Sequence, residues 1–334
     1  MASSDLPPRG SPTPGAAVDS SGVLVPGKVA VITGASSGIG RCTALRCAKL
    51  GMKLVLADIN AADLEAVRQE CVEAGALPDS VLAQLCDVTK EAQVMELKKA
   101  AFGTFKAVHF LMNNAAIQNN GNASAIEFLD RWKAVMDVNF FGVVYGCQFF
   151  VPDMIASGES CVVVNTGSKQ GITSPPGDTA YNCSKSAVKT LTEGLQHTLR
   201  STPGCKVNAF LLVPGWTVTM IATKANQRLQ GDSWNAAMAQ DERSYDGVAD
   251  RTAAAEKLMA RGAWPADLVV DELFGAIDAG APFYIVCPDG ETTRAMDKGR
   301  MQWAADDLLF RRQPLSRWSE QYKEEYAEVS KGFV

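Results

Sequence analysis

Short apolar runs alternate with stretches of helical spacing along most of the chain. Runs rich in Val, Leu and Ile occupy residues 29–33, 53–58, 81–86, 108–112, 161–166, 207–213 and 283–286. Continuous apolar runs of this length, bounded by Gly and Ser, are typical of strands buried on both faces. Apolar residues at helical spacing predict helices at about 41–50, 91–102, 139–155, 181–200 and 265–279. This alternation predicts an α/β fold with a doubly wound parallel sheet between two layers of helices.

The two ends of the chain depart from this pattern. Residues 1–27 are rich in Pro, Ser, Gly and Ala and have almost no bulky apolar residue before Val23, which predicts a disordered leader. The leader has neither an apolar signal core nor an Arg-rich amphipathic pattern, so we expect a cytoplasmic protein and leave an organellar address open. Residues 291–334 carry Trp303, Trp318 and Tyr326 among many charges. These aromatic residues predict a C-terminal extension that packs on the domain or on a neighbouring subunit. In the second case it can contribute to the substrate pocket of that subunit.

Composition narrows the function. The 334 residues are 47% hydrophobic and carry a net charge of -5, and the basic residues form no stripe, which argues against nucleic acid or a membrane surface as partner. No apolar run approaches the length of a membrane span. The nine cysteines lack metal-ligand spacing and there are only two histidines, so we expect no metal site, no hydrolase triad and a reduced intracellular compartment.

A glycine-rich turn follows the first predicted strand. Gly34, Gly38 and Gly40 stand between that strand and a helix, an order in which backbone N–H groups can cradle a phosphate, although it also occurs in tight connections. The second predicted strand ends at Asp58, 18 positions after Gly40. A carboxylate there can accept both ribose hydroxyls of an adenosine and repel a 2′-phosphate, or it can cap the next helix. Arg41 leaves some room for a 2′-phosphate.

A serine and a Tyr–Lys pair follow the fifth predicted strand. Ser168 comes just after the strand, and Tyr181 and Lys185 lie one turn apart on the next helix. An ammonium close to a phenol favours the phenolate and brings the Tyr pKa toward the working range for proton transfer. Such a pair is also common between surface neighbours, so the pair by itself is a weak indication.

Taken together, these segments resemble the short-chain dehydrogenase/reductase family. The resemblance covers about residues 28–290 and rests on the turn from Thr33 to Gly40, Asn113-Asn114-Ala115, Asn139, Ser168, Tyr181 with Lys185, and Pro214-Gly215. It implies a single Rossmann-type domain, usually assembled as a homodimer or homotetramer. It also implies catalytic roles: Tyr181 as general acid/base, Lys185 lowering its pKa and holding the nicotinamide ribose, Ser168 orienting the substrate carbonyl, and Asn139 positioning a water.

The same resemblance implies the residues around the ligands. The cofactor residues are expected to be Gly34, Ser36, Ser37, Gly38, Ile39, Gly40, Asp58, Ile59, Asp87, Val88, Asn114, Ala115, Ala116, Tyr181, Lys185, Pro214, Gly215, Thr217 and Thr219. Asp87 is equally suited to begin a turn. The substrate is expected to contact Ile117, Gln118, Lys169, Gln170 and Trp216. Residues 217–262 are expected to form a lid over it; the alternative is that they form an ordinary helical insertion on the surface. Two departures from the family pattern, Ala116 and Gly167, remove none of the proposed chemistry.

The sequence therefore predicts an NAD-dependent oxidoreductase that interconverts a small-molecule secondary alcohol and a ketone. The alternatives are an NADP-dependent carbonyl reductase with the same residues and a non-catalytic dinucleotide-sensing protein. An epimerase or dehydratase is disfavoured, because such relatives differ in glycine spacing and have a longer substrate domain.

Overall fold

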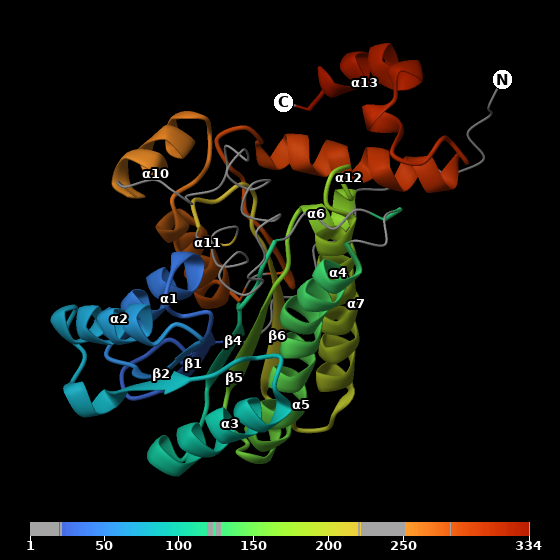
Figure 1. Cartoon of the computed structure of the whole chain (residues 1–334). Coiled ribbons are helices and arrows are strands. Elements are labelled where there is room, and N and C mark those ends of the chain that lie inside the picture. Colours follow the sequence, from blue (N-terminus) through green and yellow to red (C-terminus); the bar gives the residue numbers. More distant parts are fainter. Residues whose placement is uncertain are drawn as a thin grey trace.

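The computed structural model describes Ser20 and residues 22–118, 123–124, 128–219, 221, 251–280 and 282–333. Seven parallel strands form one sheet in the order β3-β2-β1-β4-β5-β6-β7 (Figure 1). Their bounds are β1 Val29–Thr33, β2 Lys53–Asp58, β3 Val81–Leu85, β4 Phe110–Asn113, β5 Cys161–Thr166, β6 Val207–Val213 and β7 Tyr284–Val286. The predicted α/β fold with a doubly wound parallel sheet in a three-layer, Rossmann-type arrangement is confirmed.

Alternate residues of each strand pack against opposite helix layers. In β1, Ala30 and Ile32 face one buried cluster and Val31 faces the other. The first cluster contains α1 Gly38–Lys49, α2 Ala61–Glu73 and α11 Ala266–Asp278. The second contains α3 Glu91–Phe105, α4 Leu129–Met136, α5 Gly142–Ala156 and α7 Thr179–Ser201. Because both faces are covered, the strands are apolar without alternation, which is why they were predictable from the sequence.

The strand order reverses between β1 and β4, which are neighbours although two strands separate them in the sequence. The helices that follow these strands leave toward opposite faces, so a crevice opens at the carboxyl ends of β1 and β4. The segments after Thr33 and Asn113 meet there. The topology therefore brings the glycine-rich turn beside the Asn114–Ala115 segment.

One helical run is longer than predicted. The expected helix at 139–155 is preceded by α4 and by a π-helical turn, Asp137–Phe141, so that Leu129–Ala156 runs continuously for 28 residues. The start was missed because only Val135 of α4 is buried. By length and apolar composition alone this run could span a membrane. It was not expected from the sequence because polar residues interrupt its apolar stretches. Half of its most apolar window is buried in the fold, and core helices pass the same test.

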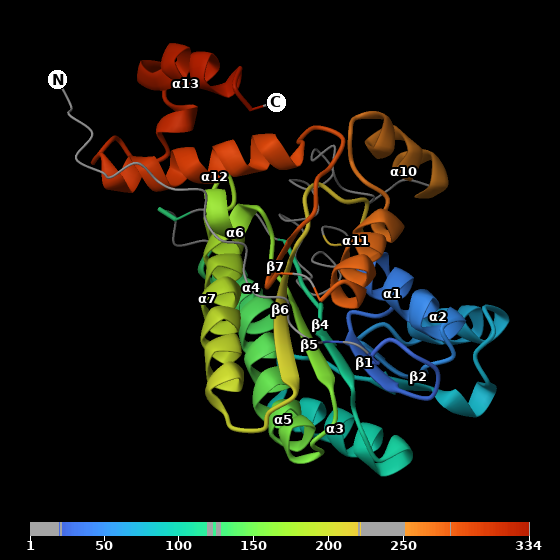
Figure 2. The same cartoon turned by 180° about the vertical axis from the view of Figure 1, so that it is seen from behind.

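The leader and the extension both pack on the domain. In the predicted disordered leader, Val23 and Leu24 are buried, and the Ser20 hydroxyl donates to the Ile277 carbonyl at 2.6 Å. Order therefore begins before residue 28, since these apolar residues fill a gap in the core. The extension forms α12 Arg294–Leu309, two short 3-10 turns and α13 Lys323–Ser330. α12 contacts the short helix α6 Gln170–Thr173, beside the carboxyl edge of the sheet (Figures 1 and 2).

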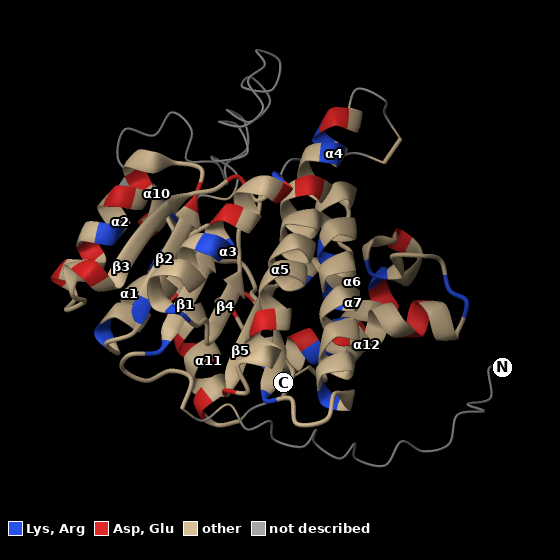
Figure 3. Cartoon of the chain, turned by 90° about the horizontal axis from the view of Figure 1, so that it is seen from below, with Lys and Arg blue, Asp and Glu red and all other residues tan. Residues whose placement is uncertain are grey.

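Charges of both signs are mixed along the helices that cover the sheet (Figure 3).

His109, one of the two histidines, is buried, and its Nδ1 accepts a hydrogen bond from the Val29 N–H at 3.1 Å. Its Nε2 lies 3.0 Å from Glu159. His109 therefore joins strand ends far from the crevice and has a structural role.

Candidate active site

A cavity of about 480 Å³ lies in the crevice at the carboxyl edge of the sheet. One wall of the cavity is the glycine-rich turn, where Gly34 and Gly38 adopt φ values of 65° and 51° that favour glycine. A Cβ on Gly40 would lie 2.2 Å from the Gly34 carbonyl oxygen, and a Cβ on Gly34 would lie 2.8 Å from Ala115 Cα. All three glycines are therefore required for the turn to fold back on the start of α1 and to approach β4.

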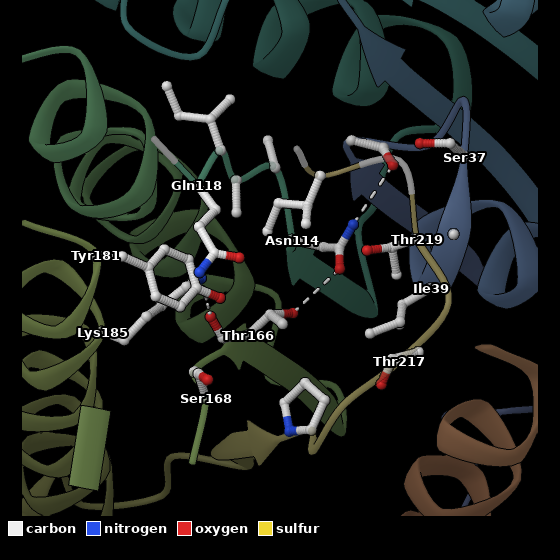
Figure 4. A pocket seen from close by; sticks show the side chains of 18 of the residues that line it. Ser37, Ile39, Asn114, Gln118, Thr166, Ser168, Tyr181, Lys185, Thr217 and Thr219 are labelled. Atoms are coloured by element: carbon white, nitrogen blue, oxygen red, sulfur yellow. Dashed lines mark hydrogen bonds between the residues drawn. The ribbon is translucent and has the colours of Figure 1, made fainter. Parts of the chain in front are cut away.

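Asn114 fastens this turn to its neighbours (Figure 4). Its side-chain N–H₂ donates to the Thr33 carbonyl at 3.1 Å, and its side-chain oxygen accepts from the Thr166 hydroxyl at 3.4 Å. The Thr33 hydroxyl in turn accepts from the backbone N–H groups of Asn114 and Ala115. The ends of β1, β4 and β5 are thus held as one unit. Ala116 lines the cavity without a positive φ, so its methyl group causes no backbone strain.

Asp58 lies at the end of the cavity nearest β2 and is only 6% exposed. Its carboxylate accepts from the backbone N–H groups of Ser36, Ile59 and Asn60 at 2.8–3.2 Å. The cap of α2 is Asn60, whose side chain accepts from the Asp63 N–H. The alternative in which Asp58 caps that helix is therefore wrong, and Asp58 instead holds the glycine-rich turn and faces the cavity.

Tyr181 and Lys185 enter the cavity from α7 and Ser168 from the end of β5 (Figure 4). The Asp178 side chain accepts from the Tyr181 N–H and begins α7 two residues before the predicted start. The Lys185 ammonium donates to the Thr166 carbonyl at 2.8 Å, which ties α7 to β5. α6 comes so close to α7 that a Cβ on Gly171 would lie 2.6 Å from the Lys185 carbonyl carbon. The absence of a side chain at Gly171 therefore sets the depth of Lys185 in the fold.

Burial shifts both pKa values away from the charged forms. It raises the pKa of the Tyr181 phenol above its ordinary value, a shift opposed by a hydrogen bond with Ser168 and reinforced by the charge of Asp178. Burial also lowers the pKa of Lys185 to about 7. From the sequence, Lys185 is expected to lower the Tyr181 pKa, but the causes that shift this pKa in the structure are burial, Ser168 and Asp178, and Lys185 is not among them. Near neutral pH Tyr181 is a neutral phenol and thus a proton donor.

Asn139 is fully buried in the π-helical turn. Its side-chain oxygen accepts from the Ile117 N–H at 2.8 Å, and its N–H₂ group donates to the Ile117 carbonyl and to the Ser184 hydroxyl. The Ser184 hydroxyl donates to the Tyr181 carbonyl. Asn139 therefore connects the segment after β4 to the helix that carries Tyr181. Asn139 itself does not line the cavity, so its expected role on a water stays a prediction.

Most of the predicted site residues meet at this cavity. Those that line it are Gly34, Ser37, Gly38, Ile39, Asp58, Ile59, Val88, Asn114, Ala115, Ala116, Ile117, Gln118, Ser168, Lys169, Gln170, Tyr181, Lys185, Pro214, Gly215, Trp216, Thr217 and Thr219. Ser36, Gly40 and Asp87 are adjacent in sequence to lining residues and do not line the cavity themselves. The Asp87 carboxylate accepts from the N–H and hydroxyl of Thr89, which is the turn role weighed for it.

Three further lining residues, Ile221, Leu258 and Arg261, lie inside the predicted lid without having been named individually, and a fourth, Glu291, was not expected at the cavity. Leu258 belongs to α10 Arg251–Ala260, inside the predicted lid, and Glu291 begins the extension. No local pattern marks these residues, because a lid and an extension reach the cavity through the fold rather than through sequence spacing. Most of the predicted lid, residues 220 and 222–250, lies outside the described residues.

The fold and the cavity define a class: α/β proteins that bind a dinucleotide at the point where a parallel sheet reverses its strand order. Gly34 and Gly40, whose Cβ atoms would collide with neighbouring backbone, fit such a ligand. Gly38 with its positive φ and Asp58 at the adenosine end fit it as well. Comparison with known proteins defines the family. Residues 28–230 match the family model described as short chain dehydrogenase, and the chain belongs to the short-chain dehydrogenase/reductase family of oxidoreductases.

Individual relatives agree with this assignment. SadH of Mycobacterium tuberculosis, named as an oxidoreductase, is 40% identical over 200 residues, 60% of this chain and 70% of SadH. The 3beta-hydroxysteroid dehydrogenase 2 of Eggerthella lenta is 34% identical over 204 residues, 61% of this chain and 76% of that protein. A short chain dehydrogenase/reductase from Burkholderia phymatum, solved in complex with NAD, is 35% identical with a TM-score of 0.70, covering 87% of this chain and 97% of its own.

Replacement of Lys185 by Met is expected to stabilise the chain measured without added cofactor. The pKa of Lys185 is about 7 in the folded chain and near ~10.4 in an unfolded one, so between these values the unfolded state binds more protons and wild-type stability rises with pH. The Lys185→Met variant lacks this ionisation. The unfolding free energy of the variant should exceed that of the wild type by about a few kcal/mol, reduced by the loss of the hydrogen bond to Thr166. This difference is largest below pH 7 and disappears near pH 10.

Thermal unfolding at pH 6, 8 and 10 measures this difference. Lys189→Met, one turn further along α7 in a partly exposed pair with Glu193, serves as control and should change the unfolding midpoint little at any pH. A Lys185→Met variant that is less stable than wild type at pH 6 would contradict the prediction.

Proposed function

We propose that the protein is an NAD-dependent oxidoreductase that interconverts a secondary alcohol and a ketone. The observation that carries the proposal is the meeting of Ser168, Tyr181 and Lys185 in the cavity whose opposite end holds the glycine-rich turn and Asp58. A proton-transfer group and a dinucleotide cradle in one cavity suit hydride transfer coupled to proton transfer. The relative named as a 3beta-hydroxysteroid dehydrogenase is consistent with a hydroxyl substrate.

The nicotinamide ring of the bound dinucleotide would supply the hydride acceptor or donor. In ketone reduction, Tyr181 donates its phenolic proton to the carbonyl oxygen as negative charge develops there. Ser168 donates a hydrogen bond to the same oxygen and holds the carbonyl in place. Lys185, as an ammonium, stabilises the phenolate left on Tyr181; its charge lies 5.6 Å from the Tyr181 ring centre. In alcohol oxidation each proton moves in the opposite direction.

Tyr181→Phe tests the catalytic assignment. The variant keeps the ring and loses the proton, so kcat should fall by a factor on the order of 10² to 10⁴, while the dissociation constant for NADH, followed by fluorescence, stays near the wild-type value. Tyr322→Phe in the extension is the matched control. Turnover of an alcohol and ketone panel that is undiminished in Tyr181→Phe would refute the assignment. Tight binding of the dinucleotide by a wild type that turns over none of the panel would favour the dinucleotide-sensing alternative.

The preference for NAD rests on two side chains. Solved structures similar to this chain are described in complex with NAD or with NADP, so family membership leaves the choice open. A 2′-phosphate beside the buried Asp58 carboxylate would meet like charge. Arg41, the cation nearest in sequence to the turn, is paired with Glu70 at 2.6 Å. The rival NADP enzyme would require that guanidinium to leave its partner.

Asp58→Asn should reduce the ratio of kcat/KM for NAD to kcat/KM for NADP at least about 10-fold, because it removes the repelling charge and keeps an acceptor for the turn. Adding Glu70→Gln should lower the ratio further by freeing Arg41. Glu65→Gln on the same helix, whose partner is Arg68, is the control. Wild-type enzyme that binds NADPH more tightly than NADH would contradict the proposed role of Asp58.

We also propose a homodimer or homotetramer assembled through α5 and α7. Phe141, at the end of the π-helical turn, and Tyr145 and Phe149 of α5 form an aromatic row. Phe141 is 43% exposed, Tyr145 and Phe149 are half-buried, and the rings of Tyr145 and Phe149 are stacked at 6.1 Å. A partly exposed aromatic row of this kind suits a protein interface.

Light scattering should therefore report an oligomer for the wild type and a monomer for Phe141→Glu/Tyr145→Glu, because two buried charges would oppose each other across the interface. Leu308→Glu, at an apolar position on α12 that is more exposed than Phe141, should leave the oligomer intact. Dissociation by the Leu308 substitution and not by the α5 pair would place the interface on the extension instead.

A further inference from the structure

A buried cluster of charges links the C-terminal extension to the residue that follows Ser168. The Lys169 ammonium lies 3.0 Å from Asp289 and 2.6 Å from Asp297, and it donates to the Thr292 hydroxyl at 2.6 Å. The side chains of Lys169, Asp289 and Asp297 are 13%, 5% and 4% exposed. One lysine is thus held by three residues that lie 120 or more positions away in the sequence.

Each charged group of the cluster has partners of opposite charge or hydrogen-bond donors around it. Two carboxylates face one ammonium, and the charge of Arg300 also acts on Asp297. The Asp289 carboxylate further accepts from the backbone N–H groups of Glu291 and Thr292. Buried charges with this many partners fix the geometry of the segments that carry them, since a displaced partner would leave an unpaired charge.

Two of these segments belong to the active site. Lys169 follows Ser168 directly, and its N–H donates to the Pro214 carbonyl. Asp289 accepts from the Trp216 N–H at 3.0 Å, in the loop that follows β6. A Cβ on Gly215 would lie 2.1 Å from the Asp289 carboxylate and 2.8 Å from the Lys169 ammonium. The loop therefore runs directly over the cluster, and Gly215 permits that contact.

We propose that Lys169, Asp289 and Asp297 are positioning residues through which the segment that runs from Asp289 into the C-terminal extension sets the placement of Ser168 and of the Pro214–Thr217 loop. The active site is then incomplete without the extension, which lies beyond the part that matches the family model. The ammonium of Lys169 is occupied by this cluster, which gives Lys169 a role other than the substrate contact expected from the sequence. The kinetic part of this inference rests on the proposed oxidoreductase function.

Steady-state kinetics test the inference in the full-length protein. Lys169→Met and Asp289→Asn should each lower kcat by about 10- to 100-fold with a smaller change in KM, because a displacement on the order of 1 Å at the reacting groups has an effect of this size. Lys169→Arg keeps a cation between the carboxylates and should retain activity within about 3-fold of wild type. Asp306→Asn, an exposed position on α12 bonded to Gln302, should have no effect.

Hydrogen exchange of the Trp216 amide gives a second measurement that does not depend on turnover. Exchange in peptides covering residues 167–170 and 214–219 should quicken in Lys169→Met and Asp289→Asn and stay at the wild-type rate in Asp306→Asn. Folded variants with wild-type kcat and wild-type exchange would refute the positioning role. A wild type without turnover, but with faster exchange in the two variants, would refute the proposed reaction and leave the positioning role intact.

Discussion

The burial of Lys185 is the constraint on which the rest of the site depends. An ammonium placed beneath the Tyr181 ring must lose its hydration, and the structure replaces that hydration with a single carbonyl, that of Thr166. Thr166 ends β5 and also donates to Asn114, which closes the glycine-rich turn of β1. The same few atoms therefore hold Tyr181 and Lys185 together with the glycine-rich turn. A displacement of β5 against α7 would alter both, so the site requires a rigid sheet.

Sequence reasoning succeeded where the chemistry is local. The bounds of β5 and β6 follow from uninterrupted apolar runs, and the roles of Gly34 and Gly40 follow from their spacing, because backbone approach demands glycine there. Tyr181 and Lys185 share a helix face, so their meeting in the cavity was predictable from i, i+4 geometry. The pKa directions were not, since they depend on burial that only the tertiary structure creates.

Sequence reasoning failed where partners are distant or the pattern is weak. Only Val135 of α4 is buried, so this helix adds little to the core, and α6 has only four residues, which is too short to show a period. Val23 belongs to a Pro- and Gly-rich leader, yet it is fully buried because the fold leaves a gap for it. Lys169 is a polar residue directly after Ser168, which is why it was expected to contact the substrate. Its partners Asp289 and Asp297 are 120 or more positions away in the sequence, and no spacing rule connects them with it.

Family membership and the extension explain different parts of the site. The sheet, the turn and the Ser168, Tyr181 and Lys185 constellation lie within residues 28–230, the part that matches the family model. Asp289, Asp297 and Glu291 lie beyond it. Glu291 lines the same cavity, and the two aspartates pair with Lys169, which also lines it. A charge network that is buried against a catalytic loop stabilises weakly, because desolvation offsets attraction, and it specifies geometry strongly, because each charge has few alternative partners. Changes in the extension can therefore tune the placement of a substrate while the shared chemistry of Tyr181 and Lys185 remains unaltered.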